Sequence, residues 1–599
     1  MKLKQIFMAV AGSCCSFYAM SDVAYTIDLS NPEHQLANVQ VQFPAVESEQ
    51  LVVNLPIWRT GKYKVLPVAD GIRTFNAVDS NGKPLGWQRT ASGEWTIDVP
   101  QASTVNISYQ VYADELGQRL RHIDDSHAYI DASGMLMYSP DYRDQPIAVQ
   151  LNVPQGWQSY SGMEQGDTPH SFIADNYDIL IDSPIETGVS HHRQFSADGR
   201  EYELVVWGEG NYNLEQIVTD LTKLSHTADV IWDNYPFERY VYMVHATSGE
   251  RGATEHLNST IIQLPRFNFR ERTDYLRFIS TASHEFIHTW NVKAYRPQGL
   301  VPYDYQNESL TQLLWLAEGS TSYFQNQLLL RADIMQPKEF FADLAKRIER
   351  NENNPGRLQQ SVAEASATAW IAQGGDYAIN HSVNIYSEGY LMSLALDFDL
   401  LNKTDLAHSY RDVHRQLYQQ YALPKGYTVR DVQQILQQLT DESYVDWWQQ
   451  HINQPIALDF VSLLNMAGLQ LSYGDKVEPD TGIQLNSNSL QIAHVKRDSP
   501  AWVAGIHADD EIIAINGLKV TAAGFSKRIN DFKAGDTIEI TAFDNQQMKQ
   551  FKLTLTDKPK DKLKIIAVKN PSRSQKAFLK AWLGIDWPFD KQGKWKSEK

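Results

Sequence analysis

The sequence predicts a multidomain α+β protein in which a mainly helical region lies between two regions rich in strands. Three patterns along the 599 residues indicate this order. Apolar and polar residues alternate from residue 22 to 188, apolar residues recur with helical spacing from about 274 to 452, and short alternating segments return after 469. A chain of this length is too long for one hydrophobic core, so we expect several domains.

The first region, residues 22–188, predicts a mostly antiparallel β domain. Val39, Val41 and Phe43 alternate with polar residues, and Val105 and Ile107 do the same further along. Asn-Pro, Asp-Gly and Asn-Gly pairs between such segments are typical of tight turns. We expect this domain to pack against the next one and to form one wall of its cleft.

The first 21 residues predict a secretory signal. Two lysines precede an apolar run that is short for a transmembrane helix, and small residues suited to cleavage follow it. We expect an exported chain that begins near Asp22, in a bacterial periplasm, while a lipoprotein-like context at Cys14 leaves membrane anchoring there as an alternative. Cys14 and Cys15 are the only cysteines, so the mature chain would have neither disulfides nor thiolate ligands.

The overall composition is that of an acidic globular protein. Hydrophobic residues make up 42% of the chain and its net charge is −18. Binding to nucleic acid or to an anionic membrane needs basic patches, so neither is expected as a partner. After the signal no stretch is long and apolar enough to cross a membrane.

The second region, residues 189–465, predicts a small sheet followed by helices. Strand candidates at 204–207 and 236–244 flank a helical pattern at 214–235, and the alternating segment 254–264 predicts an edge strand. This order, a small sheet followed by a helical lobe, suits a thermolysin-like architecture.

Residues 281–291 lie in a predicted helix and contain the pattern His-Glu-x-x-His. His284 and His288 are four residues apart, so they share one helix face and can bind a single metal ion. Glu285 lies on a neighbouring face, where it can act as a general base toward water. Two surface histidines beside a glutamate are the alternative for so short a pattern.

Glu318 is the candidate third ligand, on a second helix expected to begin near Ser309. A hydrolytic zinc site uses three protein ligands and leaves one position open. Because the mature chain would have no cysteine, we expect His284, His288 and Glu318 to hold one Zn²⁺ per chain.

The residues around these ligands resemble a known family. Trp315-x-x-Glu-Gly resembles the block that carries the glutamate ligand of gluzincin metallopeptidases, and His284-Glu-Phe-x-His-x-Trp-Asn resembles the glycyl aminopeptidase family of these enzymes. Members of that family combine a β N-terminal domain, a thermolysin-like catalytic domain and a PDZ domain. Segments 55–63 and 177–184 resemble the family's N-terminal landmarks, with Thr60 where proline is usual.

The resemblance also implies residues that bind the substrate. Gly252-Ala-Thr-Glu-His256 resembles the strand motif whose glutamate holds the free α-amine, which implies that Glu255, with Gly252 and His256, binds the substrate's N-terminus. Thr254 stands where an apolar residue is common.

The resemblance also implies a tyrosine that stabilises the transition state. Residues 385–389 resemble the Y-x-x-G element whose tyrosine donates to the oxyanion, which implies Tyr386, with Tyr390 as the nearby alternative.

The C-terminal strands resemble a PDZ domain, residues 466–560. A strand at 491–495, a short helix opened by Ser-Pro-Ala, a strand ending in Asn-Gly at 516–517, a helix at 525–532 and strands at 537–556 follow one another. Such domains bind extended peptides, usually C-termini, by strand addition; a packing module without a ligand is the alternative. We expect residues 561–599 to form a basic tail with a docking helix at 577–583.

The function implied by the resemblance is that of an exported zinc aminopeptidase. It would act on peptides with a free N-terminus, prefer small residues such as Gly or Ala, and use Glu285 as general base. Two alternatives stay open. One is an endopeptidase guided by its PDZ domain, and the other is a non-catalytic binding protein or chaperone.

Overall fold

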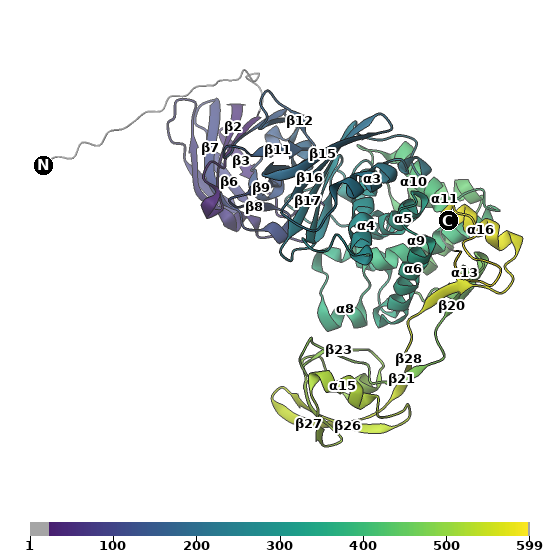
Figure 1. Ribbon diagram of the computed structural model, residues 1–599. Coiled ribbons are helices and arrows are strands. Elements are labelled where there is room, and N and C mark those ends of the chain that lie inside the picture. The colour runs from purple at the N-terminus through teal and green to yellow at the C-terminus, as the bar shows by residue number, and fades with distance from the viewer. Residues whose placement is uncertain (1–22, 597–599) are drawn as a thin grey trace.

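A computed structural model describes residues 23–596 and shows three bodies (Figure 1). A β-rich N-terminal domain packs on one side of a mixed α/β body, and a small third domain lies below that body. The signal predicted over residues 1–21 lies outside the described residues. None of the helices in the described part is long and apolar enough to span a membrane.

The N-terminal domain is built from three sheets, as the alternation of apolar residues predicts. The largest has the order β12-β13-β10-β1-β2-β7-β4, and its pairs are antiparallel except for β1 with β10. The others are β11-β14-β9-β8 and β3-β6-β5. The elements are β1 (Val23–Asp28), β2 (Leu36–Val46), β3 (Gln50–Asn54), β4 (Ile72–Val78), β5 (Trp87–Ala91), β6 (Glu94–Asp98), β7 (Ser103–Tyr112), β8 (Arg121–Ile123), β9 (His127–Ile130), α1 (Ala132–Met135), β10 (Ile147–Asn152), β11 (Gln158–Ser161), β12 (Glu164–Gln165), β13 (Ser171–Ala174), α2 (Tyr177–Ile181) and β14 (Ile185–Gly188).

The α/β body begins with a five-stranded sheet of order β15-β16-β17-β19-β18. The prediction of one edge strand over 254–264 is wrong. The chain turns at residues 256–258, and the strands before and after the turn, β18 and β19, form a hairpin. Asp182 of the N-terminal domain accepts a hydrogen bond from the Leu257 backbone N–H at 2.9 Å, which fixes this turn. The strands are β15 (Ser190–Ala197), β16 (Arg200–Trp207), β17 (Arg239–Thr247), β18 (Gly252–Glu255) and β19 (Ser259–Pro265).

Helices cover this sheet and continue to residue 466. In α4 the apolar residues Tyr275, Phe278, Ile279, Ala282 and Phe286 are buried at helical spacing and anchor the helix in the main core. The helices are α3 (Leu214–Ser225), α4 (Arg272–His288), α5 (Ser320–Arg331), α6 (Pro337–Glu352), α7 (Val362–Ala367), α8 (Gly375–His381), α9 (Ile385–Lys403), α10 (Tyr410–Tyr421), α11 (Val429–Thr440), α12 (Val445–His451) and α13 (Phe460–Met466).

The helix expected to begin near Ser309 starts later and in a different form. A π-helical turn, Trp315–Gly319, leads directly into α5. It crosses α9 so closely that a Cβ added to Gly319 would lie 2.4 Å from the Gly389 Cα. Only glycine fits at this crossing, and the wider π turn accommodates the approach of the two helices.

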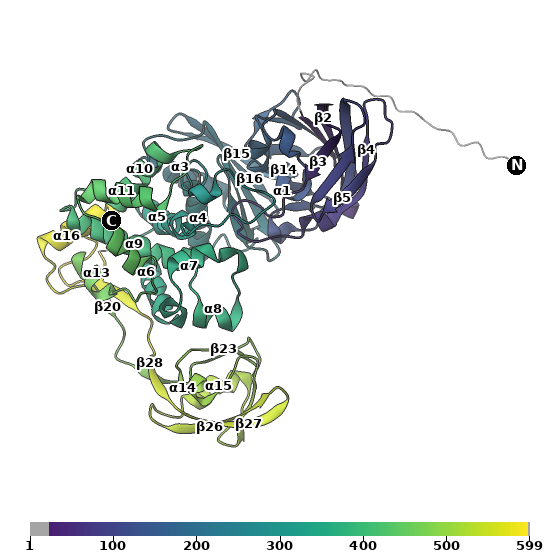
Figure 2. The ribbon, with the colours of Figure 1, turned by 180° about the vertical axis from the view of Figure 1, so that it is seen from behind.

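The small domain has the strand and helix order expected of a PDZ domain and a hydrophobic core of its own. Two antiparallel ribbons, β20 with β29 and β21 with β28, connect it to the helical body (Figure 2). Asn380 of α8 also donates a hydrogen bond to the Val495 carbonyl at 2.9 Å. The elements are β20 (Leu469–Ser472), β21 (Val477–Asp480), β22 (Ile483–Leu485), β23 (Ile492–Val495), α14 (Pro500–Ala504), β24 (Glu511–Ile515), β25 (Leu518–Lys519), α15 (Ala522–Ile529), β26 (Thr537–Asp544), β27 (Gln547–Thr554), β28 (Thr556–Pro559) and β29 (Lys564–Ala567).

In the segment predicted as a basic tail, residues 561–599, a helix forms where the docking helix is expected, and the residues described up to 596 complete the helical body. Trp582 of α16 (Arg573–Leu583) is fully buried, and its indole N–H donates to the Tyr323 hydroxyl at 2.8 Å. Leu469 lies inside the predicted PDZ range, 466–560, and Ile565 lies after it, yet both belong to the core of the helical body. The PDZ domain is therefore inserted within the helical body, because the apolar residues before and after it pack together.

Candidate metal centre and active site

The histidines of α4 face Glu318 across a cleft. Their Nε2 atoms are 3.0 Å apart, and Glu318 Oε2 lies 3.2 Å from His288 Nε2 and 3.8 Å from His284 Nε2. Glu318 is placed there by the π-helical turn that precedes α5. The structure therefore brings the three predicted ligands together with their donor atoms converging.

Both histidines are oriented by contacts on the far side of their rings. His284 Nδ1 is 2.9 Å from Gln325 Oε1, and His288 Nδ1 is 2.8 Å from the Asn291 carbonyl oxygen. Because both partners only accept here, each Nδ1 carries the hydrogen and each Nε2 keeps its lone pair for a metal. Gln325 follows Glu318 along the same helical run, but no sequence signal distinguishes it from other surface glutamines.

The two carboxylate oxygens of Glu318 make different contacts. Oε2 faces the histidines, while Oε1 accepts a hydrogen bond from the Tyr63 hydroxyl at 3.2 Å. Burial raises the pKa of Glu318, but His288 and His284 outweigh that effect and lower it to about 2. Tyr63 belongs to segment 55–63, which resembles an N-terminal motif of the family, so this segment contacts the metal site directly.

The donor set fits zinc. Two imidazole nitrogens and one carboxylate oxygen are the ligands of many hydrolytic zinc sites, whereas Mg²⁺ and Ca²⁺ prefer oxygen ligands alone. The three residues also line an open cleft of 720 Å³, which leaves room for water and substrate at the fourth position.

Glu285 lies beside the ligands, with its side chain directed into the cleft. One of its carboxylate oxygens is within 4.8 Å of a Glu255 oxygen and a His288 nitrogen. Burial raises the pKa of Glu285 to about 8, and the carboxylates of Glu255 and Glu318 add to this, while His288 opposes it. A divalent cation at the ligands would lower this pKa again.

The edge strand β18 carries Glu255 into the same cleft, and the N-terminal domain covers it. A Cβ on Gly61, whose φ is +77°, would lie 2.5 Å from Glu255 Oε2, so only glycine fits over this carboxylate. Gly252 also lines the cleft, with φ at +138°, under the Arg119 guanidinium. Arg119 Nε donates to Thr254 Oγ1 at 3.1 Å, which gives the threonine a role that an apolar residue could not fill.

His256 does not belong to the substrate-binding set that the resemblance implies. β18 ends at Glu255, and His256 is the first residue of the turn that follows it. It is fully buried, its Nδ1 lies 3.2 Å from Asp182 Oδ1, and it is not among the residues that line the cleft. Its position supports the packing of the two domains.

Of the two candidate tyrosines, Tyr386 lines the cleft and Tyr390 does not. Asn384 caps α9 by accepting from the Tyr386 backbone N–H at 2.9 Å, which places Tyr386 in the first turn with its ring centroid 6.1 Å from that of His284. Tyr390 is buried one turn later under the Arg347 guanidinium, 4.4 Å from its ring centroid. Burial raises the pKa of Tyr386, so its hydroxyl stays protonated and can donate.

The fold and this site define a zinc metallopeptidase. The sequence matches the family models of the M61 glycyl aminopeptidases in both of their domains. The model of the Peptidase M61 N-terminal domain matches residues 24–189, that of the M61 glycyl aminopeptidase matches residues 277–392, and that of a PDZ domain matches residues 479–555. The predicted resemblance and the predicted fold class are therefore confirmed.

Solved structures include a similar chain of nearly equal extent. An aminopeptidase N family protein from Idiomarina loihiensis is 27% identical and has a TM-score of 0.86 over 94% of this chain and 100% of that chain. An M1 zinc metallopeptidase from Deinococcus radiodurans is 13% identical, with a TM-score of 0.45 over 70% of this chain and 90% of that chain. Yeast LTA4 hydrolase in complex with bestatin is also 13% identical, with a TM-score of 0.45 over 76% of this chain and 74% of that chain. No curated protein matches the sequence.

Proposed function

We propose that this chain removes the N-terminal residue of peptides that have a free amino group, at one catalytic zinc ion held by His284, His288 and Glu318. The observation that carries the proposal is the position of Glu255, whose carboxylate lies within 4.8 Å of Glu285 and is covered by Gly61. An extended peptide could not continue past this covered carboxylate, so the amino terminus of the substrate would stop there.

The charges at this end of the cleft favour an ammonium group. Glu255 and Glu285 are both buried, and their carboxylate oxygens lie close together. A cationic amine between them forms charge-assisted hydrogen bonds and relieves the repulsion of the two acids. An acetylated N-terminus carries no charge and would leave Glu255 buried without a partner, which is costly.

The residues around the ligands can carry out the hydrolysis. Zinc, when bound, supplies a Lewis acid that acidifies water and polarises the peptide carbonyl. Glu285 accepts the proton of the attacking water and then delivers it to the leaving amine. The Tyr386 hydroxyl donates a hydrogen bond to the carbonyl oxygen as negative charge develops there.

The preference for Gly or Ala at the N-terminus, the export to a periplasm and the binding of C-termini by the PDZ domain complete the proposal. The family description as glycyl aminopeptidase supports the first, and the PDZ match supports the third. The pattern of residues 1–21 supports export.

Paired peptides test the central claim. Gly-, Ala-, Leu- and Arg-initiated pentapeptides would be offered to the zinc-loaded chain in free and N-acetylated forms, and products would be identified by mass spectrometry. We expect single-residue release from the free peptides, fastest for Gly and Ala, and no cleavage of acetylated ones. Internal cleavage of acetylated peptides would establish the endopeptidase alternative, and equal rates for all four residues would remove the size preference. A zinc-loaded chain that cleaves neither form would establish the non-catalytic alternative.

A further inference from the structure

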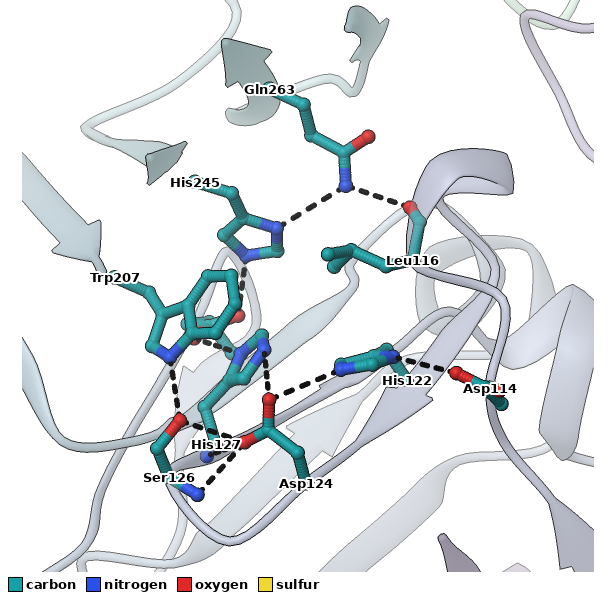
Figure 3. A network of polar contacts seen from close by, with 10 residues as sticks. Asp114, Leu116, His122, Asp124, Ser126, His127, Trp207, His245 and Gln263 are labelled. Carbon is teal, nitrogen blue, oxygen red and sulfur yellow. Dashed lines mark hydrogen bonds and ion pairs between the residues drawn. The ribbon is translucent and has the colours of Figure 1, made fainter. Parts of the chain in front are cut away.

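A second group of side chains with metal-ligating atoms lies outside the catalytic cleft, on the hairpin formed by β8 and β9 (Figure 3). His122 Nε2 lies 3.2 Å from Asp124 Oδ2, and His127 Nε2 lies 3.8 Å from the same oxygen. The two imidazoles and the carboxylate therefore present two nitrogens and one oxygen to a common point.

His127 is held as a metal-binding histidine would be. Its side chain is fully buried, and its Nδ1 is 3.0 Å from Glu186 Oε1, so Nδ1 donates and Nε2 keeps its lone pair. Trp207 stacks on the ring at a centroid distance of 3.6 Å and fixes its plane. Within residues 23–596, Nε2 has no hydrogen-bond partner, although it is buried and directed at Asp124.

Asp124 is equally well oriented. Its Oδ1 accepts from the Ser126 backbone N–H at 2.8 Å, from the Ser126 hydroxyl at 2.7 Å and from the His127 backbone N–H at 2.9 Å. These bonds saturate one oxygen and leave Oδ2 for the two imidazoles. His122 completes the set, with its Nδ1 facing Asp114 Oδ1 at 3.9 Å.

We propose that His122, Asp124 and His127 bind a second Zn²⁺ ion. Four ligands at tetrahedral angles and zinc bond lengths lie roughly 3.3 Å from one another, so the 3.2 Å pair already fits and the 3.8 Å pair closes slightly. Nitrogen and carboxylate donors together favour zinc or a similar transition metal over Mg²⁺ and Ca²⁺. A hydrogen-bonded cluster without metal leaves the buried His127 Nε2 unpaired, whereas the ion satisfies it.

This ion would strengthen the junction between two domains. Glu186 of β14 contacts His127 through one oxygen and His245 of β17 through the other, at 2.9 Å, so His127 is linked to the sheet of the α/β body. The Asp124 side chain is 29% exposed and the His122 side chain 10%, which gives the ion a route from solvent and water a place as fourth ligand. The site is independent of the proposed catalytic function.

Metal counting on the full-length chain tests the proposal. The protein would be stripped with a chelator, reloaded with Zn²⁺, dialysed and analysed by mass spectrometry for zinc per chain. We expect two ions in the unaltered chain, one in His122→Ala, one in His284→Ala, and none in the double variant. His192→Ala, which removes a histidine bonded to Glu203 by one ring nitrogen, is the matched control and should keep two. One ion in the unaltered chain, still present in His122→Ala, would overturn the proposal.

A second variant and a thermal measurement distinguish loss of the ion from misfolding of His122→Ala. Asp124→Asn keeps the side chain's shape and should lose the second ion as well. In the His284→Ala background, added Zn²⁺ should raise the melting temperature, and Asp124→Asn should abolish that rise. A zinc-dependent rise that survives Asp124→Asn would place the ion elsewhere and contradict the proposal.

Discussion

The Tyr63 hydroxyl donates a hydrogen bond to Glu318 Oε1 at 3.2 Å, which joins a residue of the N-terminal domain to a ligand carried by the helical body. The oxygen that faces the histidines is the other one, Oε2. The N-terminal domain therefore orients the metal centre from outside as well as forming a wall of the cleft.

Tyr63→Phe should weaken zinc binding without removing a ligand. Loss of a hydrogen bond to a metal-binding carboxylate typically lowers affinity by about 10-fold or more. Competition with a chromogenic chelator would measure this, and Tyr303→Phe, at a nearby tyrosine that does not contact Glu318, should leave the affinity unchanged. Equal affinities in the Tyr63 variant and the unaltered chain would show that the contact does not orient the ligand.

Glu285→Gln should keep zinc and lose hydrolysis. The amide has the same shape but cannot accept a proton, and general-base catalysis contributes on the order of 10²–10⁴-fold. Activity on a free Ala-peptide and zinc per chain would be measured on the same sample. Substantial activity in this fully loaded variant would exclude Glu285 as the general base.

Tyr386→Phe should lower kcat by roughly 10²-fold and change KM little, because the hydroxyl acts on charge that develops in the transition state. Tyr390→Phe is the control, since Tyr390 lies one turn away on α9 and outside the cleft. Steady-state kinetics of both variants distinguishes the two assignments. A larger loss in the Tyr390 variant would reverse them.

Glu255→Gln should reduce kcat/KM for free peptides by about 10- to 100-fold, the value of a hydrogen bond to a charged group. Glu339→Gln is a suitable control, because Glu339 lines the same cleft but is paired with Arg272 at 2.8 Å. Similar losses in both variants would point to the general charge of the cleft and not to an anchor for the amine.

Asp182→Asn should destabilise the fold at neutral pH by roughly 3 kcal/mol, because it leaves the buried Lys293 ammonium, 2.6 Å away, without its counter-charge. Burial raises the pKa of Asp182, but Lys293 and His256 outweigh it and hold that pKa well below the ordinary 3.8. This stabilisation is therefore present above pH 3.8 and is lost as the pH falls below it.

Urea unfolding of the two proteins between pH 7 and pH 3 would show this dependence. The difference between them should shrink at the acid end. Asp182→Asn combined with Lys293→Met should recover part of the loss, since no unpaired charge then remains. A difference that is constant with pH would assign the effect to packing.

The parts of the site that follow local rules could be predicted from the sequence. Helical spacing places His284 and His288 on one face, and the motif around Glu318 identifies a third ligand. The strand, turn and helix order of the PDZ domain is local in the same sense. Each of these depends on residues that are close together along the chain.

The remaining features depend on contacts between distant segments. Tyr63 and Gly61 reach the cleft from another domain, and His256, in the turn after β18, contacts Asp182 of that domain instead of lining the cleft. Two motif glycines, Gly319 and Gly389, touch where two helices cross, a relationship that neither motif reveals alone.

The insertion of the PDZ domain within the helical body determines the order in which the protein can mature. Trp582 fills the core beside Tyr323, yet the ribosome makes it only after the whole PDZ segment. The body that holds the metal centre thus lacks part of its interior until the inserted domain has been synthesised. A nascent chain interrupted within the PDZ segment would lack Trp582 and the rest of α16, and its helical body would be left with an open core.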